Sequence, residues 1–290
     1  MPKDPLRLVL HVGVYVVLYF LTALIFGQLL LWLGGPLVGN VGAVLFSAFS
    51  ANWLALRIYE NRRVVELGLW WNRASAENLA WGLICGAGSA VLVLLPPLAT
   101  GAAHMARASA GLSAGSIIFV VALLAAGAAG EELFFRGYGF QLLLAQLGPF
   151  ATILPVGVVF ALLHRANPNA TWPGIANTAG FGILFGYAYF RSRDLWLPMG
   201  LHFGWNLTFP LFGVKLSGLK IGVTGYEMSW TAGGLWSGGD YGPEASVLTS
   251  AVLLLLAIFL WKAPVRRQRS PLTGPPAERA VCDASPLLPS

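Results

Sequence analysis

Two adjacent carboxylates, Glu131 and Glu132, interrupt an apolar stretch of this chain, AAGAAGEELFFRGYGF. Ionisable side chains are costly inside a bilayer, so those that remain in apolar segments are candidates for function. Neighbours on a helix point about 100° apart, so we expect the two carboxylates not to share a partner. Glu132 can pair with Arg136 one turn later, which leaves Glu131 facing another helix. The alternative is a charge cluster that ends a membrane segment at the surface.

Two further polar motifs lie in apolar segments. Phe160-Ala-Leu-Leu-His164 ends one segment, and a single histidine there could also be a packed or interfacial residue. In another segment, His202 and Asn206 are four residues apart and share one helix face. Alone, this pair could form a hydrogen-bonding seam between helices. Because two of the four histidines of the chain fall in these motifs, we interpret the three motifs together.

These residue types are the ones that hydrolysis of a peptide bond by water requires. A carboxylate such as Glu131 can act as general base, and a histidine can orient the water or share its proton. Histidine and asparagine N–H groups can hold the oxyanion that forms when water attacks a carbonyl carbon. No Ser or Cys lies near a His in a recognisable nucleophile motif, which favours attack by water.

The composition indicates that membrane helices must position these residues. Apolar residues make up 57% of the 290 residues and charged residues only 10%, against about a quarter in soluble domains. Runs of about twenty apolar residues are long enough to cross a bilayer as helices, and the alternation typical of a membrane barrel is absent. We predict an all-α, polytopic transmembrane helix bundle of about eight spans. The predicted spans are residues 8–33, 37–57, 79–99, 114–134, 149–166, 173–190, 195–212 and 245–262.

The chain divides into four parts on this basis. Residues 1–113 form N-terminal transmembrane helices and residues 114–212 the catalytic core helices. Residues 213–262 form a loop, with Trp230, Trp236 and Tyr241 as interfacial anchors, and the last transmembrane helix. Residues 263–290, rich in Pro, Ser and Arg, are expected to be a disordered cytoplasmic tail. Fourteen of the 18 Lys and Arg fall on the side of the termini, which predicts that both termini are cytoplasmic.

Depth along the helices predicts that the motifs meet. Glu131 lies seventeen residues before Gly148 and His164 sixteen after it, so a helical hairpin that turns at Gly148-Pro149 puts both at one height. His202 follows a loop on the same side. We therefore expect a cavity open to the cytoplasm, under a hairpin that projects above the membrane surface. Three polar residues favour this projection: Arg136, Gln141 and Gln146. Hydropathy alone would instead start a span at Pro149 and place His164 near the far surface.

The three motifs resemble the CAAX-processing and bacteriocin-processing protease family, also called Abi or type II CAAX endopeptidases. Its pattern is EExxxR, FxxxH and HxxxN on successive helices, and all three occur here in order over roughly residues 114–212. The resemblance implies an intramembrane endopeptidase in which a Glu and a His activate water and a His and an Asn bind the oxyanion. Carried across, the catalytic residues are Glu131, His164, His202 and Asn206. The supporting residues are Glu132, Arg136 and Phe160.

The resemblance also implies partners and a location. The substrate is expected to be a peptide or a membrane protein, with or without a lipid group. The protein is expected to be integral to a bacterial plasma membrane. The net charge of +6 is attributed to membrane orientation, so no nucleic-acid partner is expected.

Three alternatives remain at this point. Glu131, His164 and His202 are chemically suitable zinc ligands, but the HExxH spacing is absent, so we predict no cofactor and keep a zinc-dependent protease as the alternative. Intramembrane Glu and His would also serve a proton-coupled transporter, although the two similar halves of such proteins are not evident. A family member without catalysis, used as a binding scaffold, is the third alternative.

Overall fold

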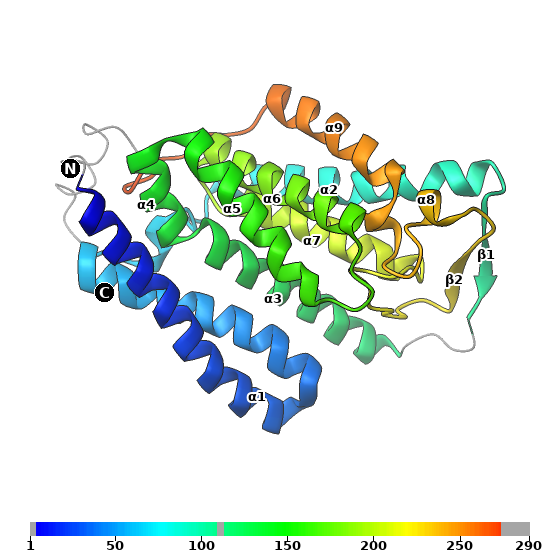
Figure 1. Cartoon of the computed structure of the whole chain (residues 1–290), viewed down its shortest axis with the longest axis horizontal. Helices are drawn as coiled ribbons and strands as arrows, with labels where there is room; N and C mark the ends of the chain where they lie inside the picture. Colours follow the sequence, from blue (N-terminus) through cyan, green and yellow to red (C-terminus); the bar gives the residue numbers. More distant parts are fainter. Residues whose placement is uncertain (1–3, 109–112, 274–290) are drawn as a thin grey trace.

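The computed structural model describes residues 4–108 and 113–273, which are mostly helical. The long helices are α1 (Pro5–Ala55), α2 (Arg73–Ala99), α3 (Ala114–Arg136), α4 (Tyr138–Leu147), α5 (Pro149–Leu163), α6 (Trp172–Ser192), α7 (Trp196–Leu211) and α9 (Val247–Lys262). The short elements are η1 (Leu56–Glu60), η2 (Val64–Leu67), β1 (Ala103–Arg107), η3 (His164–Ala166), β2 (Tyr226–Trp230), α8 (Gly234–Ser237) and η4 (Pro243–Ala245). The helices run back and forth between the two ends of one bundle (Figure 1).

α1 is a hairpin of two helical arms. Its chain reverses at Gly35, whose φ of 77° and ψ of −177° suit only glycine, and Pro36 then opens the second arm. The arms pack closely, because a Cβ at Gly39 would lie 3.0 Å from the backbone of Leu31. The predicted spans 8–33 and 37–57 correspond to these arms, which Figure 1 shows in blue.

α2 and α7 pack through glycines on both helices. A Cβ at Gly86 would lie 2.1 Å from the carbonyl oxygen of Leu201, and one at Gly204 would lie 2.6 Å from that of Leu83. Small residues four apart allow such close approach of helix backbones in membranes. This contact fixes the face of α7 opposite to α2, on which His202 and Asn206 lie.

The end of α3 is held by α1. The chain leaves the helix at Gly137, and Asn52 on the second arm of α1 bridges the break: its Nδ2 donates to the Leu133 carbonyl (2.9 Å) and its Oδ1 accepts from the Tyr138 amide (2.7 Å). The Tyr15 hydroxyl on the first arm donates to the Phe134 carbonyl (2.8 Å). Backbone groups that the helix break frees are thus satisfied inside the protein, as they must be away from water.

The polar residues after Glu132 do not project from the bundle as predicted. Arg136 and Gln141 have no exposed surface. The Gln141 amide donates to the carbonyls of Leu67 (2.9 Å) and Arg136 (3.0 Å). Gln146 is half-buried in a small pocket with the start of α1. Hydropathy cannot tell a polar group that faces solvent from one that is paired inside a bundle.

The loop between α7 and α9 contains structure that was not predicted. β2 pairs with β1 in an antiparallel register that joins Ala103 to Trp230 and Arg107 to Tyr226. Of the three expected interfacial aromatics, Trp230 lies in β2, Trp236 is exposed and Tyr241 is fully buried. This two-stranded sheet lies at one end of the bundle (Figure 1).

The segment that follows α9 corrects part of the predicted disordered tail. Residues 263–273 cross the opposite end of the bundle, where the Gln268 side chain donates to Asp194 (2.7 Å) and the Arg266 amide to Asn78 (2.9 Å). Burial raises the pKa of the Asp194 carboxyl, while its hydrogen bonds from Asn78 and Gln268 act in the other direction. These partners come from distant helix ends, so composition alone could not reveal them. The rest of the predicted tail lies outside the described residues.

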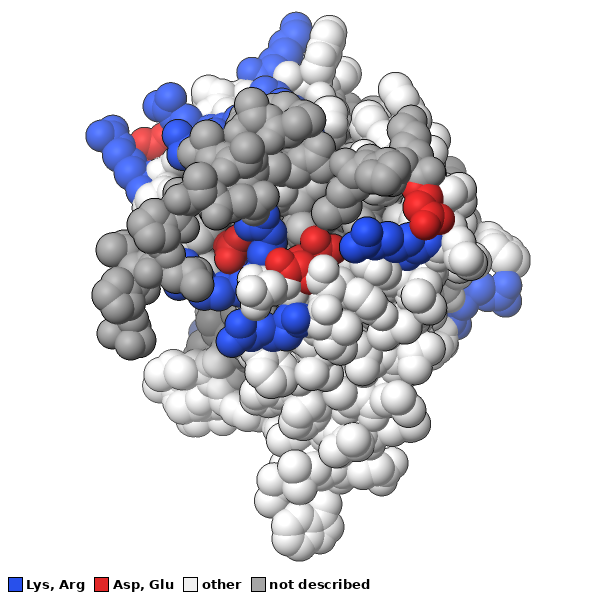
Figure 2. All heavy atoms as spheres, turned by 90° about the vertical axis from the view of Figure 1, so that its left-hand side faces the viewer, with Lys and Arg blue, Asp and Glu red and all other residues white. Residues whose placement is uncertain are grey.

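Helix length and composition fit a membrane protein. In the described part of the chain, four helical stretches are long and apolar enough to cross a bilayer: Pro5–Glu60, Arg73–Ala99, Ala114–Leu147 and Pro149–Ala166. The all-α class is confirmed, and each of the eight predicted segments lies largely on a helix. The number of crossings stays a prediction. Charged residues gather on the end of the bundle where α1 begins, as Figure 2 shows, and include the Arg62–Glu66 and Arg266–Glu77 pairs.

Candidate active site

Glu132 and Arg136 form an ion pair inside the bundle. The Arg136 Nη1 lies 3.1 Å from the Glu132 Oε1, and both side chains are fully buried. Arg136 also donates through Nη2 to the Gly182 carbonyl on α6 (2.7 Å). Its guanidinium lies 5.2 Å from the Phe160 ring centroid and 5.5 Å from that of Phe185. The predicted pair is therefore present, and it ties α3 to α6.

His164 follows the last residue of α5 and points at Glu131. Its Nδ1 lies 2.8 Å from the Phe160 carbonyl oxygen, which can only accept, so Nδ1 carries a proton. The Phe160 ring lies against the imidazole, with centroids 4.5 Å apart. The other nitrogen, Nε2, lies 3.9 Å from the Glu131 Oε2. Phe160 thus sets both the tautomer and the direction of His164.

His202 contacts both carboxylates of the motif, contrary to the prediction that they share no partner. Its Nδ1 lies 2.9 Å from the Glu132 Oε1, and its Nε2 lies 3.8 Å from the Glu131 Oε2. The geometry is possible because the two nitrogens lie on different edges of the ring. The ring stacks on Phe185 at 4.9 Å, which holds this orientation.

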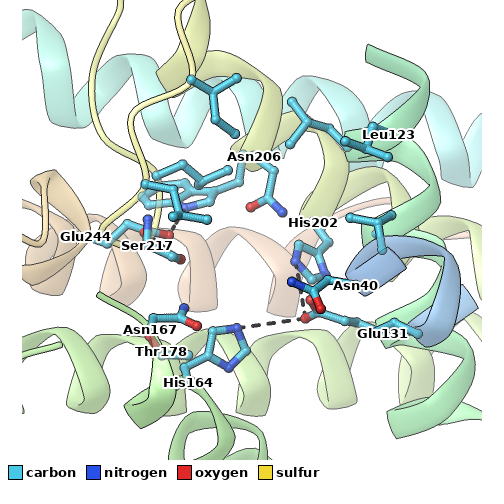
Figure 3. Close-up of a pocket in the computed structure, with 18 of the residues that line it drawn as sticks. Asn40, Leu123, Glu131, His164, Asn167, Thr178, His202, Asn206, Ser217 and Glu244 are labelled. Atoms are coloured by element: carbon cyan, nitrogen blue, oxygen red, sulfur yellow. Dashed lines mark hydrogen bonds and ion pairs between the residues drawn. The ribbon is translucent and has the colours of Figure 1, made fainter. Parts of the chain in front are cut away.

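The four predicted catalytic residues line one pocket of about 410 Å³. Figure 3 shows His164 and His202 on either side of Glu131, with Asn206 one turn further along α7. The Asn206 side chain makes no hydrogen bond to any residue that the structure describes, so its amide is free to bind a ligand. The apolar wall is formed by Leu37, Val41, Val44, Val120, Leu123 and Leu124, from the second arm of α1 and from α3.

Comparison with known proteins agrees with this arrangement. Residues 113–208, from α3 into α7, match the family model described as type II CAAX prenyl endopeptidase Rce1-like. This segment is similar to Rce1-like proteases. The resemblance seen in the motifs is thereby confirmed, and the match supports a membrane endopeptidase of this family that acts on a peptide substrate. Together with its apolar helices, the match indicates an integral membrane protein. Searches among curated proteins and among solved structures found no match.

The Rce1-like segment contains every predicted site residue, but part of the pocket lies outside it. Ser217 on the loop after α7, Glu244 on η4 and Asn40 on α1 also line the pocket, and the sequence analysis did not identify them. Of these three residues, Glu244 is the one that the sequence could have indicated, because it follows a Gly-Pro pair directly before the last apolar segment. Asn40 is a single polar residue in the apolar run of the predicted span 37–57, and Ser217 lies in the predicted loop, so neither belongs to a recognisable motif.

The pocket is lined in part by residues near the turn of α1 and in the loop that precedes β2. Its lining includes Leu37, just after the turn of α1, and Leu216 and Ile221, which precede β2. The turn of α1 and the two strands lie away from the end of the bundle at which α1 begins (Figure 1). Access to this pocket from the side of the termini therefore stays a prediction. His164 directly follows the last residue of α5, at the far end of the segment that hydropathy alone starts at Pro149, and Glu131 lies beside it.

The four predicted catalytic residues, in the described geometry, do not fit a metal ion. In the described ranges, no group of three His, Cys, Asp or Glu side chains is arranged to hold one. Two ligands of one tetrahedral zinc ion lie about 3.4 Å apart. The Glu131 Oε2 is 3.8 and 3.9 Å from the two histidine Nε2 atoms. We derive no step through a metal.

Proposed function

We propose that this protein is an intramembrane endopeptidase in which Glu131 and His164 activate a water molecule. The observation that carries the proposal is the position of the Glu131 Oε2. This buried atom lies 3.8–3.9 Å from the Nε2 atoms of His202 and His164 and makes no direct hydrogen bond within the described protein. Polar atoms separated by more than about 3.5 Å are commonly bridged by water. A water molecule at this position would contact the carboxylate and His164 together.

The reaction follows from the roles of these groups. Glu131 accepts a proton from the water molecule while the water oxygen bonds to the substrate carbonyl carbon, which yields a tetrahedral oxyanion. The carbon–nitrogen bond then breaks, and the proton returns to the leaving amine. The lone pair of the His164 Nε2 orients the water, since Nδ1 already donates to the Phe160 carbonyl.

His202 and Asn206 are suited to hold the oxyanion. His202 has carboxylates beside both nitrogens, so it can donate from Nδ1 to Glu132 and from Nε2 into the pocket. The free Asn206 amide lies on the same helix face. Donors aimed at a developing oxyanion are worth about 2.7–4 kcal/mol each in other hydrolases.

The apolar wall and the surrounding helices favour a membrane-embedded substrate. We propose a peptide or membrane-protein substrate, with or without a lipid group, in a bacterial plasma membrane. A second, smaller pocket reaches Glu131 and His164 between α1 and α5, lined by Tyr19, Val44 and Leu163. It offers the substrate a route from the lipid side.

Comparing membrane proteomes tests this proposal. Cells that contain the wild-type protein are compared with cells that contain Glu131→Gln, with new protein termini measured by mass spectrometry. We expect fragments that occur with the wild type and vanish with Glu131→Gln. The matched control is Glu227→Gln, a half-buried surface carboxylate on β2, which should leave these fragments in place. Identical termini for the wild type and Glu131→Gln would contradict the proposal.

A further inference from the structure

The pocket has a second polar part that the proposed mechanism does not use. It is formed by Asn167 after η3, Thr178 on α6, Ser217 on the loop after α7 and Glu244 on η4. With the adjacent Tyr241, we call these residues the polar recess. In Figure 3 the four lining residues lie on the opposite side of the pocket from Glu131.

Glu244 is fixed in the wall of the polar recess by donors from three elements. Its Oε1 accepts from the Trp205 indole on α7 (3.0 Å), and its Oε2 accepts from the hydroxyl (2.9 Å) and the backbone amide of Ser217. The Asn177 amide on α6 donates to the Glu244 carbonyl (2.8 Å). The Glu244 carboxylate is therefore held in a fixed position in the pocket wall and is not a surface charge.

Tyr241 brings an unpaired hydroxyl to the same place. The side chain has no exposed surface, and its hydroxyl has no hydrogen-bond partner within the described part of the chain. It lies beside Ser217, Thr178 and Asn167. A buried polar group without a partner is costly, and nearly all such groups in native proteins find one. Tyr241 lies behind the pocket wall, so the polar groups that face a ligand are those of Asn167, Thr178, Ser217 and Glu244.

The charge of the pocket restricts what this ligand can be. Among the described residues that line it are Glu131 and Glu244 but no Lys or Arg. Three nearby cations are engaged by carboxylates: Arg136 by Glu132, Lys215 by Asp240 and Lys220 by Glu227. Arg165, between His164 and Asn167, is exposed and stacks on the Trp172 ring (4.5 Å). Residues 109–112, which the structure does not describe, contain no Lys or Arg either.

We propose that the polar recess binds the main chain of a substrate that continues beyond the cleaved bond, and that it disfavours a free α-carboxylate. This inference rests on the proposed function. The pocket has room for only a few substrate residues, so a C-terminus near the cleaved bond would place its carboxylate close to Glu131 or Glu244. The His202 imidazolium is already flanked by the Glu131 and Glu132 carboxylates, so it does not offset this repulsion. The preferred substrates are then neutral or basic chains cut at an internal bond, rather than chains that lose a C-terminal tripeptide.

Two forms of one peptide test the inference. The peptide spans a cleavage site found by the proteome comparison and ends three residues after the cut, either as a free acid or as an amide. We expect the purified full-length protein to cleave the amide with a kcat/KM at least tenfold higher. Glu244→Gln should bring this ratio closer to one. Asn167→Lys adds a cation at a half-buried loop position and should favour the free acid, whether or not Glu244→Gln folds. Glu77→Gln, a half-buried carboxylate at the start of α2 and outside the pocket, should keep the wild-type ratio.

The outcomes separate this inference from the proposed function. Equal cleavage of both forms by the wild type, abolished by Glu131→Gln, would overturn the inference alone. A wild-type preference for the amide that neither Glu244→Gln nor Asn167→Lys changes would also overturn it. Cleavage that survives in Glu131→Gln would overturn the proposed function, and the inference with it.

Discussion

At the scale of single residues, the two carboxylates of the EExxxR motif differ in what surrounds them. Glu132 is fully buried and bonded to Arg136 and His202. Glu131 is partly exposed to the pocket and has no direct hydrogen bond at Oε2. Glu132 holds the site together, and Glu131 is available for chemistry. His202 lies beside both carboxylates, so a substitution of either one changes the surroundings of the same imidazole.

This difference predicts that substitutions of the two carboxylates affect the stability of the fold differently. Glu132→Gln leaves the buried Arg136 without a carboxylate, and breaking such a pair typically costs about 3–5 kcal/mol. Glu131→Gln removes no hydrogen bond and should leave the melting temperature close to that of the wild type. Thermal unfolding of both purified variants measures the contrast. Equal melting temperatures for Glu132→Gln and the wild type would show that the pair does not stabilise the fold.

Asn206 is predicted to act on the rate rather than on folding. Because its amide has no partner in the described structure, Asn206→Ala should leave the melting temperature unchanged. Loss of one oxyanion donor lowers kcat by about 10²–10³-fold in comparable sites. Asn169→Gly, at an exposed loop residue with φ 56°, is the control and should keep full activity. A fall in KM or stability without a fall in kcat would assign Asn206 a different role.

At the scale of the elements, three helices present the catalytic groups and others hold these helices in place. α3 carries Glu131, the end of α5 carries His164, and α7 carries His202 and Asn206. α1 clamps the end of α3 through Asn52, and α2 supports α7 from behind. The positions of the functional groups therefore depend on helix contacts outside the Rce1-like segment.

The contact between α2 and α7 can be tested with two glycines of one helix. Gly86→Ala would place a Cβ 2.1 Å from the Leu201 carbonyl oxygen, so the helices must separate; such overpacking typically costs about 1–3 kcal/mol. Gly88→Ala is the matched control, because nothing lies within 4 Å of its Cβ. We expect a lower melting temperature and lower activity for Gly86→Ala only. Equal effects of both substitutions would contradict the packing described here.

At the scale of the whole molecule, the sequence accounts for the helices and for the meeting of the motifs, but not for the polar contacts between distant segments. Apolar runs predicted the helices, and counting residues from Gly148 predicted that Glu131 and His164 lie at one height. The buried Arg136, the strands β1 and β2 and the docked Gln268 depend on hydrogen bonds between distant segments. Composition and spacing in one sequence contain no direct record of such contacts.

The orientation in the membrane remains a prediction with a further consequence. If the charge bias places the termini in the cytoplasm, the loop after α7 and the part of the pocket that it lines lie on the other side. A reporter that is active only outside the cytoplasm, inserted after Gly233, should therefore be active. The same reporter inserted after Arg63, before η2, should be inactive. The reverse pattern would place the loop after α7 in the cytoplasm.

The central claim is that Glu131 activates water without a metal ion. It is tested most directly by the cleavage rate of one identified substrate by purified wild-type protein and by Glu131→Gln, both with excess chelator present. General-base catalysis contributes about 10²–10⁴-fold. We predict full wild-type activity and a loss of at least about 10²-fold in Glu131→Gln at an unchanged melting temperature. Wild-type activity that chelator abolishes and stoichiometric zinc restores would contradict the account, as would a Glu131→Gln variant with near wild-type activity.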